Sequence, residues 1–278
     1  TTMINPMRKF VSKIVACFLA VTVLSFGLRY TNIDSVSRLL GAEIYHSIFK
    51  SQKKQKTKVL VLGDSVARQL YNNYCYNDSI YSLACNQAIT MAGYYFLLHD
   101  FIDANQDEMP KQVIVLVRPG TLGNDLDKYA FQYFLKPMYN RHYKGMMNDH
   151  LLERIHQVPM FWMTQVPFIK YTDWFPNRSV APSSTDGLFS QISIDYIDSI
   201  AALCTENNIS FSLVSTIISE NERDVFLQMS QQAIPIDTTL FINYVNSFQF
   251  LPESLFGDGV HLREENIPTD FLDLTHAD

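Results

Sequence analysis

The chain of 278 residues has no excess of basic residues, few cysteines, and neither an internal repeat nor a low-complexity segment. Its formal net charge of -6 is unlike the clustered positive surface of nucleic-acid binders, so we expect no nucleic-acid partner. Its cysteines and histidines do not stand at zinc-site spacings, and we expect no metal and no cofactor. The 47% of hydrophobic residues is enough to form one sizeable core.

Three of the four cysteines lie outside the N-terminal apolar segment that contains Cys17, and an odd number cannot pair completely within the chain. Cys75 and Cys85 could close a short loop as a disulfide if the domain is exported. Two buried thiols are an equally good interpretation of the same pair. Cys204 completes the set.

A long hydrophobic run stands at the N-terminus, where Arg8, Lys9 and Lys13 precede the uncharged stretch 14–28. Counted from Phe10, the segment has about 19 residues, close to the roughly 20 that span a bilayer as a helix. The lack of a clean small-x-small cleavage site favours a signal anchor over residues 1–29, with a cleaved signal peptide as the rival. The preceding basic residues then place the rest of the chain on the extracytoplasmic side.

Residues 30–57 form the expected connection between this anchor and the main domain. Apolar residues recur at helical spacing between Ile33 and Phe49, which predicts an amphipathic helix that lies against the domain or against the membrane. Five lysines follow between positions 50 and 58, and a solvated linker explains them better than contact with acidic lipid.

The remainder, residues 58–278, alternates between strand and helix patterns. Short buried-strand runs are expected at 59–63, 80–85, 113–117 and 211–215, and helices at 66–74, 88–104 and 192–207. This alternation predicts an α/β domain with a parallel sheet covered by helices on both faces. Residues 119–190 break the rhythm and are rich in aromatic residues, methionine and proline. We expect an insertion of short helices and loops there, suited to a wall or lid over a site.

The triplet Gly63-Asp64-Ser65 comes directly after the first strand and directly before a helix. A serine at the carboxyl edge of a parallel strand faces the crevice where α/β sheets bind ligands, and its N–H at a helix N-terminus can stabilise an oxyanion. Ser65 is therefore the candidate nucleophile. The alternative is that Asp64 or Ser65 only caps the helix.

A serine nucleophile needs a base, and His261 is the best-placed of the seven histidines. It lies in the loop sequence FGDGVHL near the end of the chain, three residues after Asp258. That spacing allows the carboxylate to accept a hydrogen bond from Nδ1 of the imidazole, while Nε2 faces the serine. The sequence thus predicts a Ser65–His261–Asp258 triad.

An early Gly-Asp-Ser after the first strand and a late Asp-x-x-His resemble the SGNH, or GDSL-like, hydrolase superfamily over about residues 58–265. The resemblance implies a three-layer α/β/α fold and an esterase, lipase or acyl (O-acetyl) transferase activity. It also implies an oxyanion hole completed by a glycine and an asparagine, for which Gly93 and Asn124 are the candidates. Their alternatives are a packing glycine and an ordinary turn residue. Arg118 could hold an anionic substrate group or pair with a carboxylate.

Gly93 comes later than the family's usual glycine, and Leu122 stands where the family's Gly-x-Asn-Asp has its first glycine. With the anchor, these departures are most similar to extracytoplasmic members that modify surface polymers, some of which work beside a multi-span membrane acyltransferase. We therefore expect acyl transfer or ester hydrolysis on a surface glycan. A non-catalytic accessory subunit and a lipase or phospholipase are the alternatives. Aromatic residues of the insertion could stack on a sugar or an acyl chain, or belong to the core; they are Trp162, Tyr171, Trp174 and Phe175.

Overall fold

The computed structural model describes residues 6–28, 42–71, 79–85, 89–166, 169, 174–175, 180, 188–231 and 236–268. Within them, the main sheet consists of parallel strands in the order β2-β1-β3-β4. Their bounds are Val59–Gly63 (β1), Ile80–Ser82 (β2), Gln112–Val117 (β3) and Ser210–Ser215 (β4). A parallel sheet mixed with helices confirms the predicted α/β class.

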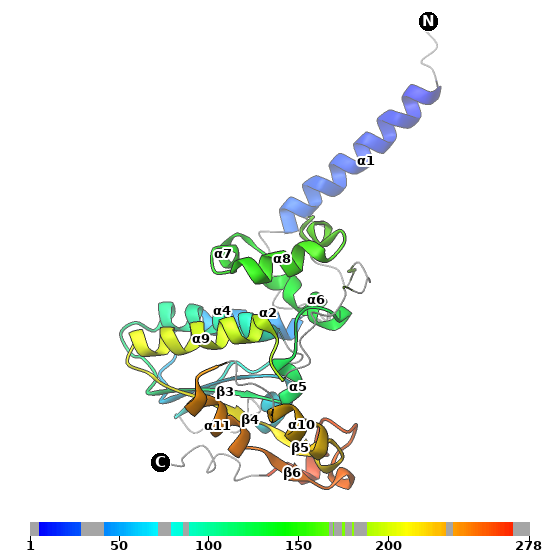
Figure 1. Ribbon diagram of the computed structural model, residues 1–278. Helices are drawn as coiled ribbons and strands as arrows, with labels where there is room; N and C mark the ends of the chain where they lie inside the picture. Colours follow the sequence, from blue (N-terminus) through cyan, green and yellow to red (C-terminus); the bar gives the residue numbers. More distant parts are fainter. Residues whose placement is uncertain are drawn as a thin grey trace, which may run out of the picture.

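Helices precede, connect and follow these strands (Figure 1). Their bounds are Pro6–Leu28 (α1), Ala42–Ser51 (α2), Ser65–Leu70 (α3), Thr90–Ala104 (α4), Pro119–Leu122 (α5), Tyr129–Leu135 (α6), Arg141–Lys144 (α7), Asp149–Gln157 (α8), Gln191–Glu206 (α9), Arg223–Ser230 (α10) and Thr238–Asn246 (α11). Short 3₁₀ turns add to them, among them Phe161–Gln165 (η3).

The strands form where the sequence has continuous apolar runs, because both faces of the sheet are covered. All five residues of β1 are buried. Leu60 and Leu62 pack in the cluster that contains α2, α4 and α9, whereas Val59 and Val61 pack with α3 and the C-terminal loop. Strand β2 is shorter than expected, and its pairing with β1 continues through the N–H groups of Leu83 and Cys85.

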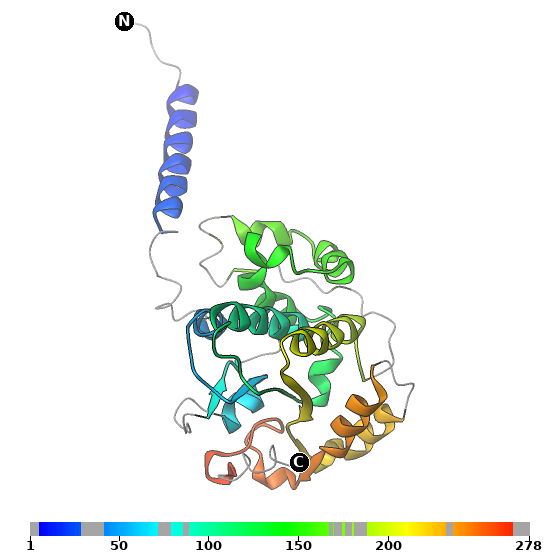
Figure 2. The same ribbon diagram turned by 90° about the vertical axis from the view of Figure 1, so that its left-hand side faces the viewer.

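The aromatic-rich insertion lies on the α2, α4 and α9 side of the sheet, and the C-terminal loop lies on the other side (Figures 1 and 2). A buried carboxylate fastens it there: Asp100 of α4 accepts hydrogen bonds from the Tyr143 hydroxyl (2.5 Å) and from Gln52 Nε2 (3.1 Å). His142 Nε2 lies 2.7 Å from the other Asp100 oxygen. The short helices of the insertion agree with the prediction. The described residues of the insertion do not pack over the C-terminal loop, where a wall or lid was expected.

A second, two-stranded parallel sheet was not predicted. Strand β5 (Ile217–Ser219) follows β4 after Thr216, and it pairs with β6 (Gln249–Leu251). Runs of three residues are too short to give a clear pattern in the sequence. This small sheet leads the chain into the loop that carries Asp258 and His261.

The predicted N-terminal helix is present as α1, and its apolar side chains are exposed. In the part of the chain that the structure describes, no helix combines the length and hydropathy required to cross a membrane. The expected connecting helix is present in part as α2, which packs against α4 with Ile44 buried. Cys85 is a buried free thiol, as is Cys204, while Cys75 lies outside the described residues.

Candidate active site

Ser65 stands at the first position of α3, directly after β1, because Asp64 ends the strand and caps the helix. Asp64 has an extended backbone, and its Oδ1 accepts hydrogen bonds from the N–H groups of Val66 (3.1 Å) and Ala67 (3.3 Å). The capping interpretation therefore holds for Asp64. It leaves the neighbouring Ser65 hydroxyl available for another partner.

The second carboxylate oxygen of Asp64 joins α3 to the end of β3. Asp64 Oδ2 accepts hydrogen bonds from the Arg118 N–H (2.9 Å) and from the Thr121 hydroxyl (2.8 Å). Asp64 is buried, and each of its oxygens has two donors. This network fixes the position from which Ser65 projects. Sequence reasoning missed Thr121, for which the one available signal is its place soon after the third strand.

The loop 256–263 brings His261 to this serine from the far end of the sequence. His261 Nε2 lies 2.8 Å from Ser65 Oγ, and Nδ1 lies 2.8 Å from Asp258 Oδ2. The three residues predicted as a triad thus form one continuous chain of hydrogen bonds. With Asp258 ionised, Nδ1 carries the proton and Nε2 accepts the serine O–H, which is the arrangement that activates a hydroxyl nucleophile.

Asp258 also shapes the loop that holds the imidazole. Its Oδ1 accepts hydrogen bonds from the N–H groups of Val260 (3.0 Å) and His261 (2.7 Å), and Gly259, between Asp258 and Val260, has a left-handed φ of 77°. The backbone hydrogen bond from His261, followed by the one from its side chain, lowers the pKa of Asp258 to about 2. The carboxylate is therefore ionised at neutral pH, although it is largely exposed.

Gln69 fastens this loop to the helix that carries Ser65. Its Nε2 donates to the Leu262 carbonyl (2.7 Å), and its Oε1 accepts from the Leu262 N–H (3.1 Å). The Leu262 side chain is buried in the same apolar cluster as α3. Gln69 is one helical turn from Ser65, and a polar residue on a short helix gave no signal of this role in the sequence.

The Ser65 N–H is the candidate oxyanion donor in the described part of the site. The N–H groups of Val66 and Ala67 are bound by the Asp64 carboxylate, and that of Arg68 is bound by the Asp64 carbonyl. No hydrogen bond among the described residues occupies the Ser65 N–H. It can therefore donate to a negative charge that develops beside Ser65 Oγ.

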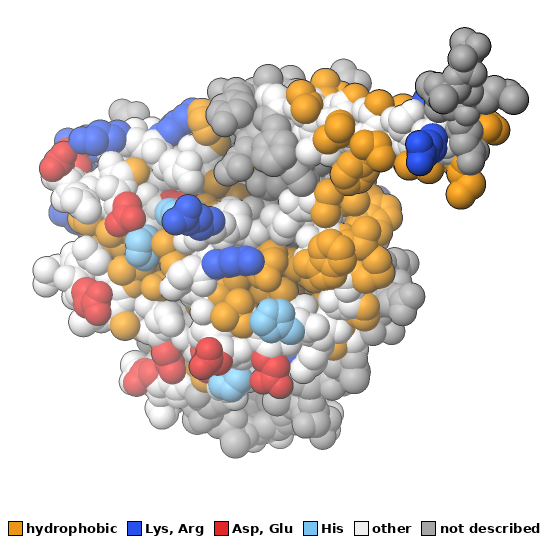
Figure 3. All heavy atoms as spheres, turned by 90° about the horizontal axis from the view of Figure 1, so that it is seen from above, with side chains coloured by type: hydrophobic (Ala, Val, Ile, Leu, Met, Phe, Trp, Pro, Cys, Tyr) orange, Lys and Arg blue, Asp and Glu red, His pale blue; other side chains and the backbone are white. Residues whose placement is uncertain are grey.

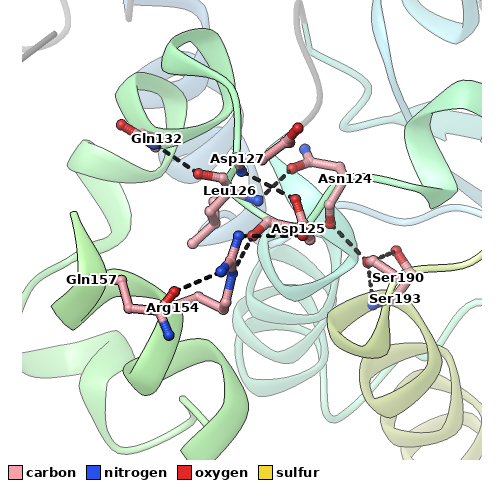
Figure 4. Close-up of polar contacts among 9 residues, drawn as sticks. All are labelled: Asn124, Asp125, Leu126, Asp127, Gln132, Arg154, Gln157, Ser190 and Ser193. Atoms are coloured by element: carbon pink, nitrogen blue, oxygen red, sulfur yellow. Dashed lines mark hydrogen bonds and ion pairs between the residues drawn. The ribbon is translucent and has the colours of Figure 1, made fainter. Parts of the chain in front are cut away.

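The two other predicted oxyanion residues have different surroundings. Gly93 lies in the first turns of α4, where a β-carbon would lie 2.6 Å from Ile89 Cγ1, so close packing explains the glycine. Asn124 is buried, and its Oδ1 accepts from the Leu126 N–H (3.2 Å) in a turn where Leu126 has a φ of 68° (Figure 4). Close packing thus accounts for Gly93, and a turn accounts for Asn124; these were the alternatives to roles in an oxyanion hole.

The segment that contains Asn124 is held from several directions (Figure 4). The Ser190 hydroxyl donates to the Asn124 carbonyl (2.8 Å). Arg154 donates through Nε to the Asp125 carbonyl (2.8 Å) and pairs with the Asp125 carboxylate (3.2 Å). Burial, followed by a hydrogen bond to Asp125, raises the pKa of Asp127. These contacts stabilise the turn between β3 and the insertion, which begins at the site.

Arg118 pairs with a carboxylate, which was the alternative to a substrate contact. Its guanidinium forms an ion pair with Glu222, and it lies 5.9 Å from the centre of the Phe226 ring. Its contribution to the site is the backbone N–H that binds Asp64. In the insertion, Phe175 is buried whereas Trp162 and Trp174 are exposed, and Tyr171 lies outside the described residues.

Comparisons of the chain with protein-family models, with curated proteins and with solved structures each found no match. In the described residues, no group of three or more His, Cys, Asp or Glu side chains is arranged to hold a metal ion. The chemistry of the site has to be inferred from its own geometry. That geometry comprises a hydroxyl, a base within hydrogen-bond distance, an orienting carboxylate and a backbone oxyanion donor.

Proposed function

We propose that this chain is a serine-dependent enzyme that transfers or hydrolyses acyl esters on a cell-surface glycan or a similar polymer. One observation carries the proposal: Ser65 Oγ, His261 and Asp258 are linked by two hydrogen bonds of 2.8 Å, although Ser65 and His261 are 196 residues apart. A serine that served only as a helix cap would not need an oriented imidazole.

The reaction proceeds through an acyl-enzyme. Ser65 Oγ attacks the ester carbonyl carbon as His261 Nε2 takes the serine proton, and the Ser65 N–H stabilises the negative oxygen of the tetrahedral intermediate. The intermediate expels the alcohol, to which His261 returns the proton. Water or an acceptor hydroxyl then gives its proton to His261 and attacks the acyl carbon, and His261 returns that proton to Ser65 Oγ as the bond to the acyl group breaks. Asp258 keeps the imidazole oriented in both steps.

The fold supports a relationship to the SGNH superfamily, including a three-layer α/β/α arrangement. The first strand leads directly into the serine, and helices cover both faces of the parallel sheet. The late Asp258 and His261 meet that serine, as the resemblance implied. Within this proposal the substrate is an acylated glycan or another acyl ester.

We also propose that residues 1–29 act as a single-pass signal anchor that attaches the domain to the extracytoplasmic side of a membrane, although α1 by itself does not combine the length and hydropathy required to cross one. Its support is a helix of 23 residues with basic residues in its first turns and exposed apolar residues after them. Such a placement would bring the domain beside a multi-span membrane acyltransferase that could supply the acyl group.

The test is ester turnover by the full chain with a panel of acetylated sugars and long-chain lipid esters. We expect hydrolysis or transfer on the acetylated sugars, and we expect Ser65→Ala to lower kcat by a factor on the order of 10⁴ or more. Ser199→Ala, a substitution on α9, serves as the matched control. Turnover that survives Ser65→Ala would contradict the proposal, and a preference for long acyl chains would favour a lipase or phospholipase.

A non-catalytic accessory subunit is the second candidate, because Gly93 and Asn124 have contacts that explain them without an oxyanion hole. In that case the cleft or the insertion would bind a polymer or a membrane partner. Polymer modification in cells would then persist when Ser65→Ala or His261→Ala replaces the original chain. The catalytic proposal requires that it stop.

A further inference from the structure

We propose that the insertion carries a second membrane contact, formed by four exposed side chains that lie on the bilayer surface. We call it the tryptophan face, and its members are Met160, Trp162, Val166 and Trp174. The inference rests on the proposed attachment of α1 to a membrane and is independent of the catalytic proposal. It names a lipid bilayer with anionic headgroups as the partner.

Both tryptophans of the chain belong to this face. Trp162 is 66% exposed and Trp174 is 42% exposed, and Met160 and Val166, which are close to Trp162 in the chain, are also exposed. Tryptophan prefers the boundary between the hydrocarbon and the headgroups, since it combines a large apolar ring with a polar N–H. Tryptophans that only filled a core would be buried.

The two tryptophans stand on a fixed support. Each follows or precedes a buried phenylalanine, and the rings of Phe161 and Phe175 lie 5.7 Å apart in an edge-to-face contact. Buried Lys136 donates through Nζ to the Trp174 carbonyl (3.1 Å) and to the Ile169 carbonyl (3.1 Å). The exposed rings therefore project from an ordered platform, which reduces the entropy lost when they bind a surface.

The insertion lies on the side of the domain where the N-terminal helix arrives. Helix α2, the first element after residues 29–41, packs on α4, and the insertion covers that same side of the sheet. Figures 1 and 2 show α1 leaving the molecule on this side. Figure 3, which views the molecule from this side, shows hydrophobic side chains gathered on its surface. A membrane that holds α1 would lie next to the tryptophan face.

Basic side chains near this face suit acidic headgroups. Lys144 of α7 lies 4.1 Å from the centre of the Tyr139 ring, and that ring packs edge-to-face on Phe161 at 4.8 Å. Arg141 on the same helix is exposed. A lysine or arginine close to an anionic membrane surface is attracted to it.

The test uses the full chain in vesicles that contain phosphatidylcholine and phosphatidylglycerol, with bromine on the acyl chains in half of the samples. Since Trp162 and Trp174 are the only tryptophans, their emission reports this face alone. We expect bromolipid to quench it severalfold more than it quenches a control, Trp162→Phe/Trp174→Phe/Val225→Trp. Val225 is exposed on α10, which Figure 1 shows at the opposite end of the domain from α7 and α8 of the insertion.

Flotation with the vesicles separates the possible outcomes. Chain that floats and shows bromolipid quenching supports the tryptophan face. If the protein floats but its tryptophan emission is quenched only by aqueous acrylamide, the tryptophan face is overturned and the attachment through α1 stays intact. Chain that does not float overturns both. A shift of emission with an acetylated oligosaccharide, without bromolipid quenching, would assign the face to a glycan and overturn the membrane contact.

Discussion

Gly63 has no room for a side chain, because a β-carbon there would lie 2.2 Å from the Leu116 carbonyl oxygen and 2.4 Å from Ala67 Cβ. We expect Gly63→Ala to separate β1 from β3 and to lower the free energy of unfolding by about 1–3 kcal/mol. Urea denaturation would measure it. Gly120→Ala is the control, since nothing lies within 4 Å of a β-carbon there, and equal effects would contradict the packing argument.

Asp258 has two functions that two substitutions can separate. Asp258→Asn keeps an oxygen for the loop N–H groups of Val260 and His261 but loses the carboxylate, so it should disturb mainly the imidazole tautomer. Asp258→Ala should also open the loop. We expect both to lower kcat on the order of 10²–10⁴-fold. Only the alanine variant should raise hydrogen exchange at His261, and equal exchange in the two variants would refute the separation.

The pH dependence of the loop follows from the same carboxylate. Its pKa is lowered from 3.8 to about 2, so its contribution to folding is fully present above pH 3.8 and is lost as the pH falls toward 2. We expect the His261 N–H to lose its exchange protection in that window. Asp258→Asn should show no such transition, and a transition that remains in that variant would assign it to another group.

At the scale of elements, the attachment of the loop 256–263 to α3 depends on Gln69. Gln69→Ala removes two hydrogen bonds to the Leu262 backbone, each worth about 0.5–1.5 kcal/mol. We expect kcat to fall about tenfold with KM unchanged, because Gln69 positions His261 without touching substrate. Gln112→Ala, on β3, is the control. A change in KM alone would contradict a positioning role.

The sequence predicted the elements whose patterns are strong and local. Apolar runs of five residues, as at 59–63 and 113–117, gave strands close to the observed bounds because burial on both faces requires such runs. The same logic placed Ser65 at a strand end. The three-residue strands β5 and β6 were missed, since their stability comes from pairing across the fold.

The sequence predicted those features of the site that depend on residues close together in the chain. Asp258 and His261 are three residues apart, so their hydrogen bond is a local property that spacing can indicate. The roles of Thr121 and Gln69 depend on contacts between segments that are distant in sequence. Asn124 and Gly93 were assigned by resemblance; the Asn124 side chain accepts from the Leu126 N–H, and a β-carbon at Gly93 would meet Ile89.

For the whole molecule, the attachment of the insertion depends on Asp100. Asp100→Ala would leave the Tyr143 hydroxyl buried without its acceptor, at a cost of about 1–3 kcal/mol. We expect the part of the insertion around Tyr143 to become sensitive to proteolysis while the Ser65 site stays intact, since Tyr143 and α3 pack on opposite sides of the sheet. Asp103→Ala, at an exposed position of α4, is the control. Unchanged proteolysis would contradict this attachment.

The central claim is that Ser65 is an activated nucleophile, and peptide mapping after treatment with a fluorophosphonate tests it most directly. Trypsin releases Val59–Arg68, VLVLGDSVAR, in which Ser65 is the only hydroxyl-bearing residue. The account predicts one adduct, on this peptide, that disappears in His261→Ala while the variant remains folded. An unmodified peptide from folded protein, or an adduct that persists without His261, would contradict it.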